Sequence, residues 1–315
     1  MRKGQNPAKF VGDVAKPQRI TVAVLSYIPF LSGFYAESLD VLRACLKSAA
    51  TEAGLPFDLM VFDNGSCQEV RDFLLQEKES GRLQYVILSE KNIGKGGAWN
   101  MMLAGAPGEI ISYADSDVRF FPGWLQRSVE LLETYPNVGM VTARPFRTPP
   151  ELYEGTLKWA RGHASVESGN FIPWETFLEF NLSLGQSEDD NRRVYAQTTD
   201  WRISYHGIQA LAGGSHWQFT AYKKALQAFL PFEMDKPMGQ VRQLDRRMND
   251  AGLLRLMVPE PLAMNMSNTV GYLRGDLKST PKAPKRSLSR TLLELQLVRR
   301  ALLAVYNRIF RWYYR

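Results

Sequence analysis

Residues 83–124 read LQYVILSEKNIGKGGAWNMMLAGAPGEIISYADSDVRFFPGW and contain two short apolar runs separated by a glycine-rich segment. The first run, 83–88, is rich in β-branched and aromatic residues and predicts a strand. Residues 92–97 follow, where glycines let the backbone approach a ligand or a packed helix, and residues 98–104 predict a short helix. The second run, 110–114, is short enough to be a buried strand of a parallel sheet.

Two carboxylates follow this second strand, in the sequence Asp115-Ser116-Asp117. In open α/β sheets, ligands bind at the carboxyl ends of the strands. A pair of carboxylates two residues apart suits Mg²⁺ or Mn²⁺ that also binds a diphosphate. The alternative is a solvated turn, because this short pattern also occurs by chance.

The neighbouring segments predict the same kind of architecture, an α/β fold with a parallel sheet. Apolar β-rich runs alternate with segments that have helical periodicity. The predicted strands are 19–27, 57–62 and 138–142, and the predicted helices are 36–53, 68–79 and 125–135. A last strand-like piece begins at Leu256.

The motifs of this region resemble the family-two glycosyltransferases of the GT-A type. Asp63-Asn64-Gly65-Ser66 matches their acidic turn, Asn92 to Asn100 matches N-x-G-x-x-x-A-x-N, and the D-x-D is followed by Pro122-Gly123-Trp124. The resemblance covers roughly residues 20–270 and is strongest in the first half. It implies a GT-A-type nucleotide-binding fold, with a mixed, mainly parallel sheet flanked by helices.

The resemblance also implies how a nucleoside-diphosphate sugar would bind. Asp63 would hydrogen-bond the base, and Ser26 and Tyr27 would line the base pocket. Asn92 and Lys95 would lie near the ribose or the phosphates.

The same resemblance implies a metal site for Mn²⁺ or Mg²⁺. Asp115 would bind both the nucleotide sugar and the cation, and Asp117 would bind the cation. Relatives often carry a histidine near Asn265 that completes the metal shell, so Asn265 is expected to be a weaker ligand through its carbonyl oxygen.

The acceptor side is expected to include His216 and Trp217, which lie in a glycine-rich segment before a strand. His216 is either a structural histidine or a candidate for a general base. Inverting relatives show an E-D pair at the start of a late helix, and the aspartate deprotonates the acceptor. This chain has Gln240-Val241 there. Asp245, one helical turn later, is the first candidate for the base, and Asp235 is the second. The alternative is that Asp245 is an ion-paired surface residue among Arg242, Arg246 and Arg247.

The implied activity is metal-assisted, inverting transfer of a sugar, with uridine as the favoured nucleoside, to a hydroxyl of a glycan or a lipid-linked acceptor. Bacterial-type surface polysaccharide or glycolipid assembly would be its setting. The alternatives are a retaining GT-A transferase and a non-catalytic scaffold of the same fold. Walker and Rossmann phosphate loops do not fit, because no G-K-[ST] follows Gly94 and residue 99 is not a glycine.

Charge and composition predict the organisation of the chain. A polar extension (1–18) precedes a transferase domain (19–270), with a nucleotide-sugar half (19–147) and an acceptor half (148–270) that shows no motif over 148–198. A Pro/Ser/Lys-rich linker (271–289) and a basic amphipathic helix (290–315) follow.

The basic residues are concentrated near the end of the chain. The net charge is +7, but residues 271–315 hold eleven Lys or Arg against two acids, so the other 270 residues carry −2 and no nucleic-acid partner is expected. Only two cysteines are present, and no segment is expected to be a signal peptide or a membrane span. A cytoplasmic protein is therefore expected. Residues 290–315 predict either peripheral attachment to the anionic inner face of the cell membrane or a helix packed on its own domain or on a second subunit.

Overall fold

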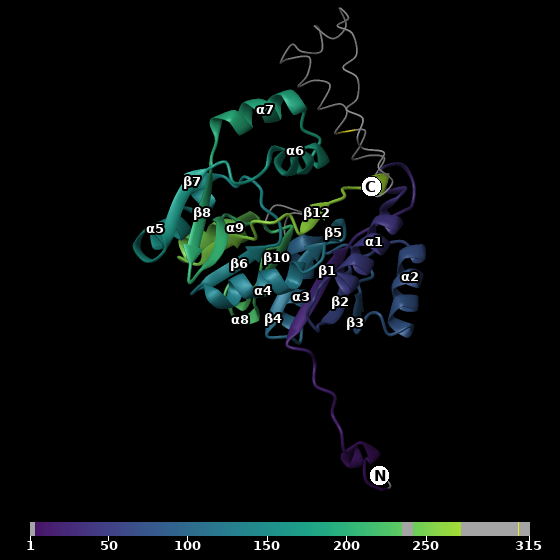
Figure 1. Cartoon of the computed structure of the whole chain (residues 1–315). Helices are drawn as coiled ribbons and strands as arrows, with labels where there is room; N and C mark the ends of the chain where they lie inside the picture. Colours follow the sequence, from purple (N-terminus) through teal and green to yellow (C-terminus); the bar gives the residue numbers. More distant parts are fainter. Residues whose placement is uncertain (1–3, 235–241, 272–307, 309–315) are drawn as a thin grey trace, which may run out of the picture. The chain divides into compact units, whose positions relative to one another are not determined.

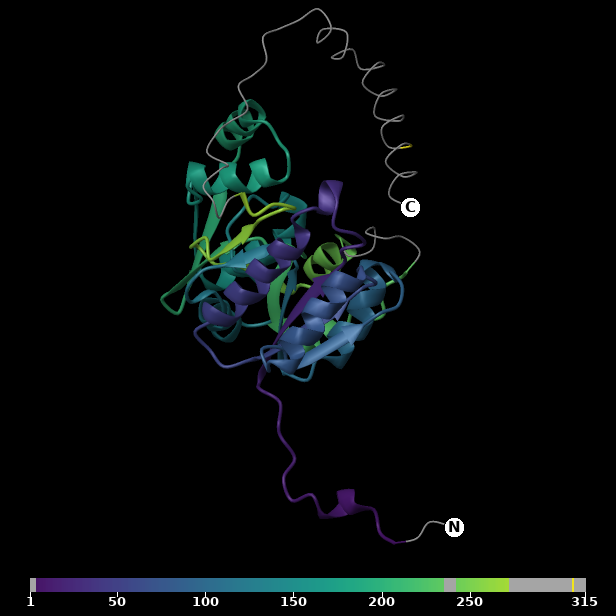
Figure 2. The same cartoon turned by 90° about the vertical axis from the view of Figure 1, so that its right-hand side faces the viewer.

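The computed structural model describes residues 4–234, 242–271 and 308 (Figures 1 and 2). Residues up to Val270 form one compact unit, and residues from Gly271 form a second. Asp235 and the predicted linker and C-terminal helix, apart from Gly271 and Arg308, lie outside the described residues. Among the described helices, none combines the length and the apolar character needed to cross a membrane.

A ten-stranded sheet runs through the first unit in the order β3-β2-β1-β4-β10-β6-β11-β9-β8-β7. The strands β1 to β4 pair in parallel, as do β6 and β11, whereas β10, β9 and β7 run in the opposite direction. The predicted mixed, mainly parallel sheet is therefore confirmed. The strands are β1 (Ile20–Ser26), β2 (Asp58–Asp63), β3 (Tyr85–Leu88), β4 (Ile110–Asp115), β6 (Val138–Thr142), β7 (Ser165–Gly169), β8 (Asp200–Tyr205), β9 (Ile208–Ala212), β10 (Gln218–Tyr222) and β11 (Leu254–Met257).

Helices cover both faces of this sheet. Strands β1, β2 and β4 bury nearly every residue, so alternate side chains pack against helices on opposite faces. One face packs on α1 (Ser38–Thr51), α2 (Gln68–Glu79), α4 (Trp124–Thr134) and α5 (Glu154–His163). The other packs on α3 (Gly94–Gly105), α8 (Lys223–Gln227) and α9 (Arg242–Asp250).

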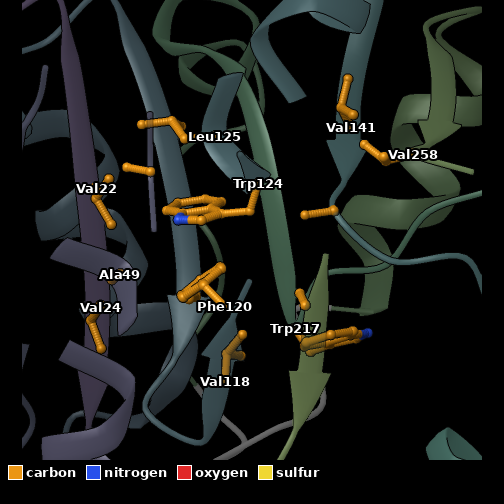
Figure 3. Close-up of a cluster of buried hydrophobic side chains, with 14 of the residues drawn as sticks. Val22, Val24, Ala49, Val118, Phe120, Trp124, Leu125, Val141, Trp217 and Val258 are labelled. Carbon is orange, nitrogen blue, oxygen red and sulfur yellow. The ribbon is translucent and has the colours of Figure 1, made fainter. Parts of the chain in front are cut away.

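The core on the first face is centred on two aromatic rings (Figure 3). Trp124, the first residue of α4, is fully buried, and its ring stacks on Phe120 with centroids 3.9 Å apart. Phe120 ends the short strand β5 (Val118–Phe120), which directly follows the two aspartates and pairs with β12 (Ala263–Asn265). This packing fixes the turn that carries Asp115 and Asp117.

Two further helices, α6 (Trp174–Ser183) and α7 (Glu188–Gln197), lie beyond the carboxyl ends of the central strands (Figures 1 and 2). They belong to the segment for which the sequence showed no motif. A small cluster of buried apolar side chains, including Phe146 and Phe177, joins them to the sheet.

Most predicted elements of the first half are confirmed to within two residues at each end. The glycine-rich segment is the exception, because α3 begins at Gly94 rather than at Ala98. Its glycines form the first helical turn, where a Cβ on Gly97 would lie 2.8 Å from the Met234 methyl carbon and 3.2 Å from Ile93. The last central strand also begins earlier than predicted, at Leu254.

Candidate active site

A cavity of about 460 Å³ lies at the carboxyl ends of β1, β2 and β4, between α1 and the start of α3. We call it the strand-end cavity. Its lining includes five residues predicted to bind the nucleotide sugar or the metal: Tyr27, Asn92, Lys95, Asp115 and Asp117.

Asp115 is held from two sides at the end of β4. Lys95, from the first turn of α3, places its Nζ 2.6 Å from Oδ1 and 2.8 Å from Oδ2 of Asp115. The Tyr113 hydroxyl donates to the same carboxylate, and burial together with the Asp115 charge raises the pKa of Tyr113. The lysine side chain is 6% exposed and the aspartate 29%, so this is a nearly buried pair that opens toward the cavity.

Within the described part of the chain, no cation forms an ion pair with Asp117. Burial and the negative charge of Asp115 raise the pKa of Asp117 to about 7, and Lys95 opposes that rise. A divalent cation would relieve the repulsion between the two carboxylates, so the donor set fits such an ion. The described residues contain no group of three or more His, Cys, Asp or Glu placed to hold a metal, so phosphate oxygens of a ligand would have to complete the shell.

Ser26 and Asp63 lie behind the lining of this cavity. They are partners in the β1–β2 register, both are fully buried, and neither lines the cavity. Among the described residues, Ser26 Oγ and Asp63 Oδ1 have no hydrogen-bond partner. Asp63 Oδ2 accepts from the Ser66 amide at 3.1 Å, and burial raises the pKa of Asp63.

Asn64 and Asn92 fix the beginning of α3 beside the cavity. Asn64 Nδ2 donates to Asn92 Oδ1 at 3.0 Å, and Asn92 Oδ1 also accepts from the Gly94 amide at 2.8 Å. The adjoining bend requires Gly65, whose φ is +88° and whose missing Cβ would lie 2.8 Å from the Lys91 carbonyl carbon. Asn64, which the sequence motif contains but which was not predicted to bind ligand, therefore also lines the cavity.

A second cavity, of about 930 Å³, lies next to the first, and Asp115 lines both. We call it the α9 cavity. It is lined by residues of α6 and α9, by the segment before β10 and by the segment after β6. His216, Trp217, Asp245 and Asn265, which were predicted to serve the acceptor, the base or the metal, all line it.

Trp217 is only 8% exposed and forms part of the cavity wall. Its ring centroid lies 5.7 Å from that of Phe180 and 6.4 Å from that of Phe146. Its backbone oxygen accepts from the Asp115 amide at 2.9 Å. The acceptor-side segment is thereby joined to the aspartate turn.

Asn265 lies at the end of β12, opposite Val118. Its Oδ1 accepts from the Ser267 amide at 2.6 Å, and the Met266 amide donates to the Asp117 carbonyl at 2.7 Å. The structure therefore brings Asn265 beside the aspartate turn, although its carbonyl oxygen already accepts one hydrogen bond.

Asp245 is neither an open carboxylate nor a surface residue among arginines of its own helix. The alternative that Asp245 is an ion-paired surface residue is wrong. Its side chain is only 6% exposed, and it pairs with Arg255 of β11 at 2.5 Å. Its other oxygen lies 2.5 Å from His216 Nδ1. Arg255 itself is fully buried, and burial lowers its pKa while Asp245 raises it.

Two side chains of this site, Tyr113 and Arg255, were not predicted from the sequence. Tyr113 lies two residues before Asp115, so the period of a strand places both on one side of the sheet, and this signal was available. Arg255 is a charged residue in the otherwise apolar run Leu253–Val258, but starting the strand at Leu256 left it outside.

Comparisons with known proteins agree with this site. Residues 33–184 match the model of the family described as glycosyl transferase family 2. An uncharacterized glycosyltransferase of Nostoc sp. is 30% identical over 100 residues, which is 32% of this chain. Those residues are only 31% of the relative, so the matched part spans about a third of that protein.

Two solved structures show a looser similarity. The mannosyltransferase PcManGT from Pyrobaculum calidifontis, in complex with GDP-Man and Mn²⁺, is 16% identical, with 83% of this chain and 60% of that chain covered and a TM-score of 0.48. TarS 1–349 of S. aureus, in complex with UDP-GlcNAc, is 14% identical, with 80% and 61% covered and a TM-score of 0.47. Scores below 0.5 give no indication of the substrate of this chain. The family match covers both aspartates and the start of α3, and residues 33–184 of this chain are therefore a domain of glycosyl transferase family 2.

Proposed function

We propose that this protein transfers a sugar from a nucleoside-diphosphate sugar to an acceptor hydroxyl. The observation that carries the proposal is the meeting of two cavities at Asp115. A donor in the strand-end cavity and an acceptor in the α9 cavity would bring their reacting atoms together beside the two aspartates. Such positioning can lower the barrier of a reaction between two substrates by about 7–11 kcal/mol.

The donor would lie with its base over the β1–β2 edge and its diphosphate at the start of α3. Asn64, from the turn after β2, lines this part of the cavity, whereas the unpartnered oxygens of Ser26 and Asp63 lie behind the lining and would meet the base only if that lining shifted on binding. Lys95 would lie near the phosphates, and Tyr27 and Asn92 would line the base and ribose positions. The family resemblance favours uridine as the nucleoside.

Asp115 and Asp117 would hold a divalent cation, Mn²⁺ or Mg²⁺, with Asn265 as a weaker additional ligand. When bound, such a cation neutralises the charge that develops on the departing diphosphate. Lys95 keeps the Asp115 carboxylate in place at 2.6 Å and lowers the repulsion that it exerts on Asp117. Lys95 would thus hold the Asp115 carboxylate in place for the cation.

The acceptor would enter the α9 cavity, whose aromatic wall of Phe146, Phe180 and Trp217 suits the apolar face of a sugar ring. Attack from that cavity, on the far side of the donor from its diphosphate, would invert the anomeric carbon. A glycan or lipid-linked acceptor, a role in surface polysaccharide or glycolipid assembly, and attachment to the inner face of the cell membrane remain proposals from the sequence.

Thermal shift with a panel of nucleoside diphosphates and their sugars, with and without Mn²⁺, tests this function. We expect one nucleotide to raise the melting temperature only with Mn²⁺. At a free nucleotide concentration of 100 times Kd, binding adds about 2.7 kcal/mol to the free energy of unfolding. Asp117→Asn should abolish the shift, whereas Asp189→Asn, an exposed position on α7, should preserve it. If no donor stabilises the protein and none is hydrolysed, the result would instead support a non-catalytic scaffold.

A further inference from the structure

His216 is the histidine of the α9 cavity. The chain has three histidines, and the other two, His163 at the end of α5 and His206 in the β8–β9 turn, do not line it. The His216 side chain is 19% exposed and belongs to the segment that joins β9 to β10. The backbone oxygen of its neighbour Trp217 accepts a hydrogen bond from the Asp115 amide. This bond positions the segment that carries the imidazole beside the turn where the donor would react.

The imidazole is held in one orientation by Asp245. His216 Nδ1 lies 2.5 Å from Asp245 Oδ2, and an ionised carboxylate can only accept a hydrogen bond. In the neutral imidazole, Nδ1 therefore carries the proton and Nε2, at the opposite edge of the ring, carries the lone pair. No hydrogen bond to Nε2 occurs among the described residues. The ring thus has the tautomer that a general base requires.

Asp245 is in turn fixed by Arg255. Its Oδ1 lies 2.5 Å from Arg255 Nη2, and the same guanidinium donates to the backbone oxygens of Gly214 and Leu152. Gly214 lies two residues before His216, so Arg255 anchors both the carboxylate and the backbone that carries the imidazole. Both oxygens of Asp245 are engaged and its side chain is 6% exposed, so Asp245 is placed to orient His216 rather than to take a proton from an acceptor.

Other charged groups line the same cavity, and they are rivals for the role of base. Glu151 and Asp250 are exposed, and no hydrogen bond or ion pair among the described residues holds either of them. Arg147, Arg246 and Arg247 also line the cavity but have no proton-accepting form near neutral pH. Asp115 also lines the cavity, but Lys95 and the Tyr113 hydroxyl engage its carboxylate. Among the described residues that line the cavity, His216 combines a free basic atom with a fixed orientation.

We propose that His216 is the general base of the transfer reaction and that Asp245 and Arg255 are its positioning residues. This inference rests on the proposed function. His216 Nε2 takes the proton of the acceptor O–H as the acceptor oxygen forms its bond to the anomeric carbon. The bond from that carbon to the diphosphate oxygen breaks, the electron pair leaves with the nucleoside diphosphate, and the imidazolium then releases its proton to solvent.

The test measures release of nucleoside diphosphate from a donor that the full-length wild type binds, with water as the acceptor. His216→Ala, His206→Ala and Glu151→Gln are compared, each with and without added imidazole. We expect His216→Ala to lower kcat by about 10²- to 10⁴-fold, the range for a general base, with the KM for the donor and the nucleotide-induced thermal shift unchanged. Imidazole should restore part of the rate in this variant alone.

The other outcomes separate the two proposals. A His216→Ala rate within a few-fold of wild type would overturn the assignment of the base and leave the transfer function standing, and loss of rate in Glu151→Gln alone would point to that carboxylate. A His216→Ala protein that loses nucleotide binding and does not respond to imidazole would show a structural role, which also overturns the assignment. A wild type that neither binds nor cleaves any donor would instead refute the proposed function itself.

Discussion

Replacing Lys95 with methionine removes the cation that holds Asp115 in the strand-end cavity. Breaking a buried ion pair by deleting one partner typically costs 3–5 kcal/mol. Here the remaining carboxylate is 29% exposed and still accepts a hydrogen bond from Tyr113, so solvent and that hydroxyl offset part of the loss. We therefore expect Lys95→Met to lower the free energy of unfolding by about 2 kcal/mol, which for a domain of this size is about 4–8 °C in melting temperature.

The variant should also change nucleotide binding, because Lys95 lowers the pKa of Asp117 and lies where the phosphates would bind. Thermal shift without ligand measures the stability loss, and thermal shift against increasing nucleoside diphosphate with Mn²⁺ measures the affinity. Lys91→Met, an exposed lysine four residues earlier, is the matched control. An unchanged melting temperature together with wild-type nucleotide affinity in Lys95→Met would refute the role of this ion pair.

Three further predictions concern single residues. Because the pKa of Asp117 is raised to about 7, the folded protein binds a proton between the ordinary aspartate pKa of 3.8 and pH 7 that the unfolded chain does not. Stability measured with a chelator should therefore rise as the pH falls from 8 through 7, and it should rise less in Asp117→Asn. Trp124→Ala should cost about 3–5 kcal/mol in denaturant unfolding because it empties a fully buried site, whereas Phe10→Ala, at a residue 73% exposed, should cost almost nothing. Gly65→Ala should destabilise the protein more than Gly81→Ala: both glycines have positive φ, but only the Cβ at Gly65 would meet backbone, 2.8 Å away, and equal melting temperatures would contradict this.

The sequence predicted the sheet well where local signals agree. The strands β1, β2 and β4 are apolar along nearly their whole length, and this pattern identifies a strand covered on both faces. The polar residues that end them mark the functional edge, because parallel strands bring their carboxyl ends together. Asp115, Asp117, Lys95 and Asn92 could be placed near one cavity from this argument and the family resemblance.

Local signals were weaker at the start of α3. Glycines usually interrupt helices, so the sequence predicted a turn there, yet α3 begins at Gly94, whose φ is +74°, and continues through Gly96 and Gly97. A tertiary contact accounts for the glycine at 97, because a Cβ there would lie 2.8 Å from the Met234 methyl carbon and 3.2 Å from Ile93, so a neighbouring side chain would have to shift. The burial of Ser26 and Asp63 behind the cavity lining likewise depends on packing across the sheet and not on their own motif.

The sequence by itself determined the main strands and helices up to residue 142, the edge of the sheet where the aspartates lie, and the family of the domain. Only the tertiary structure decided which side chains meet in the α9 cavity. His216, Asp245 and Arg255 come from three separate elements, and no spacing in the chain relates an imidazole before β10 to a carboxylate on α9 and a guanidinium on β11. Their contact follows from burial: a guanidinium that folding removes from water needs a carboxylate and backbone oxygens around it, and those lie at the junction of β11, α9 and the segment before β10.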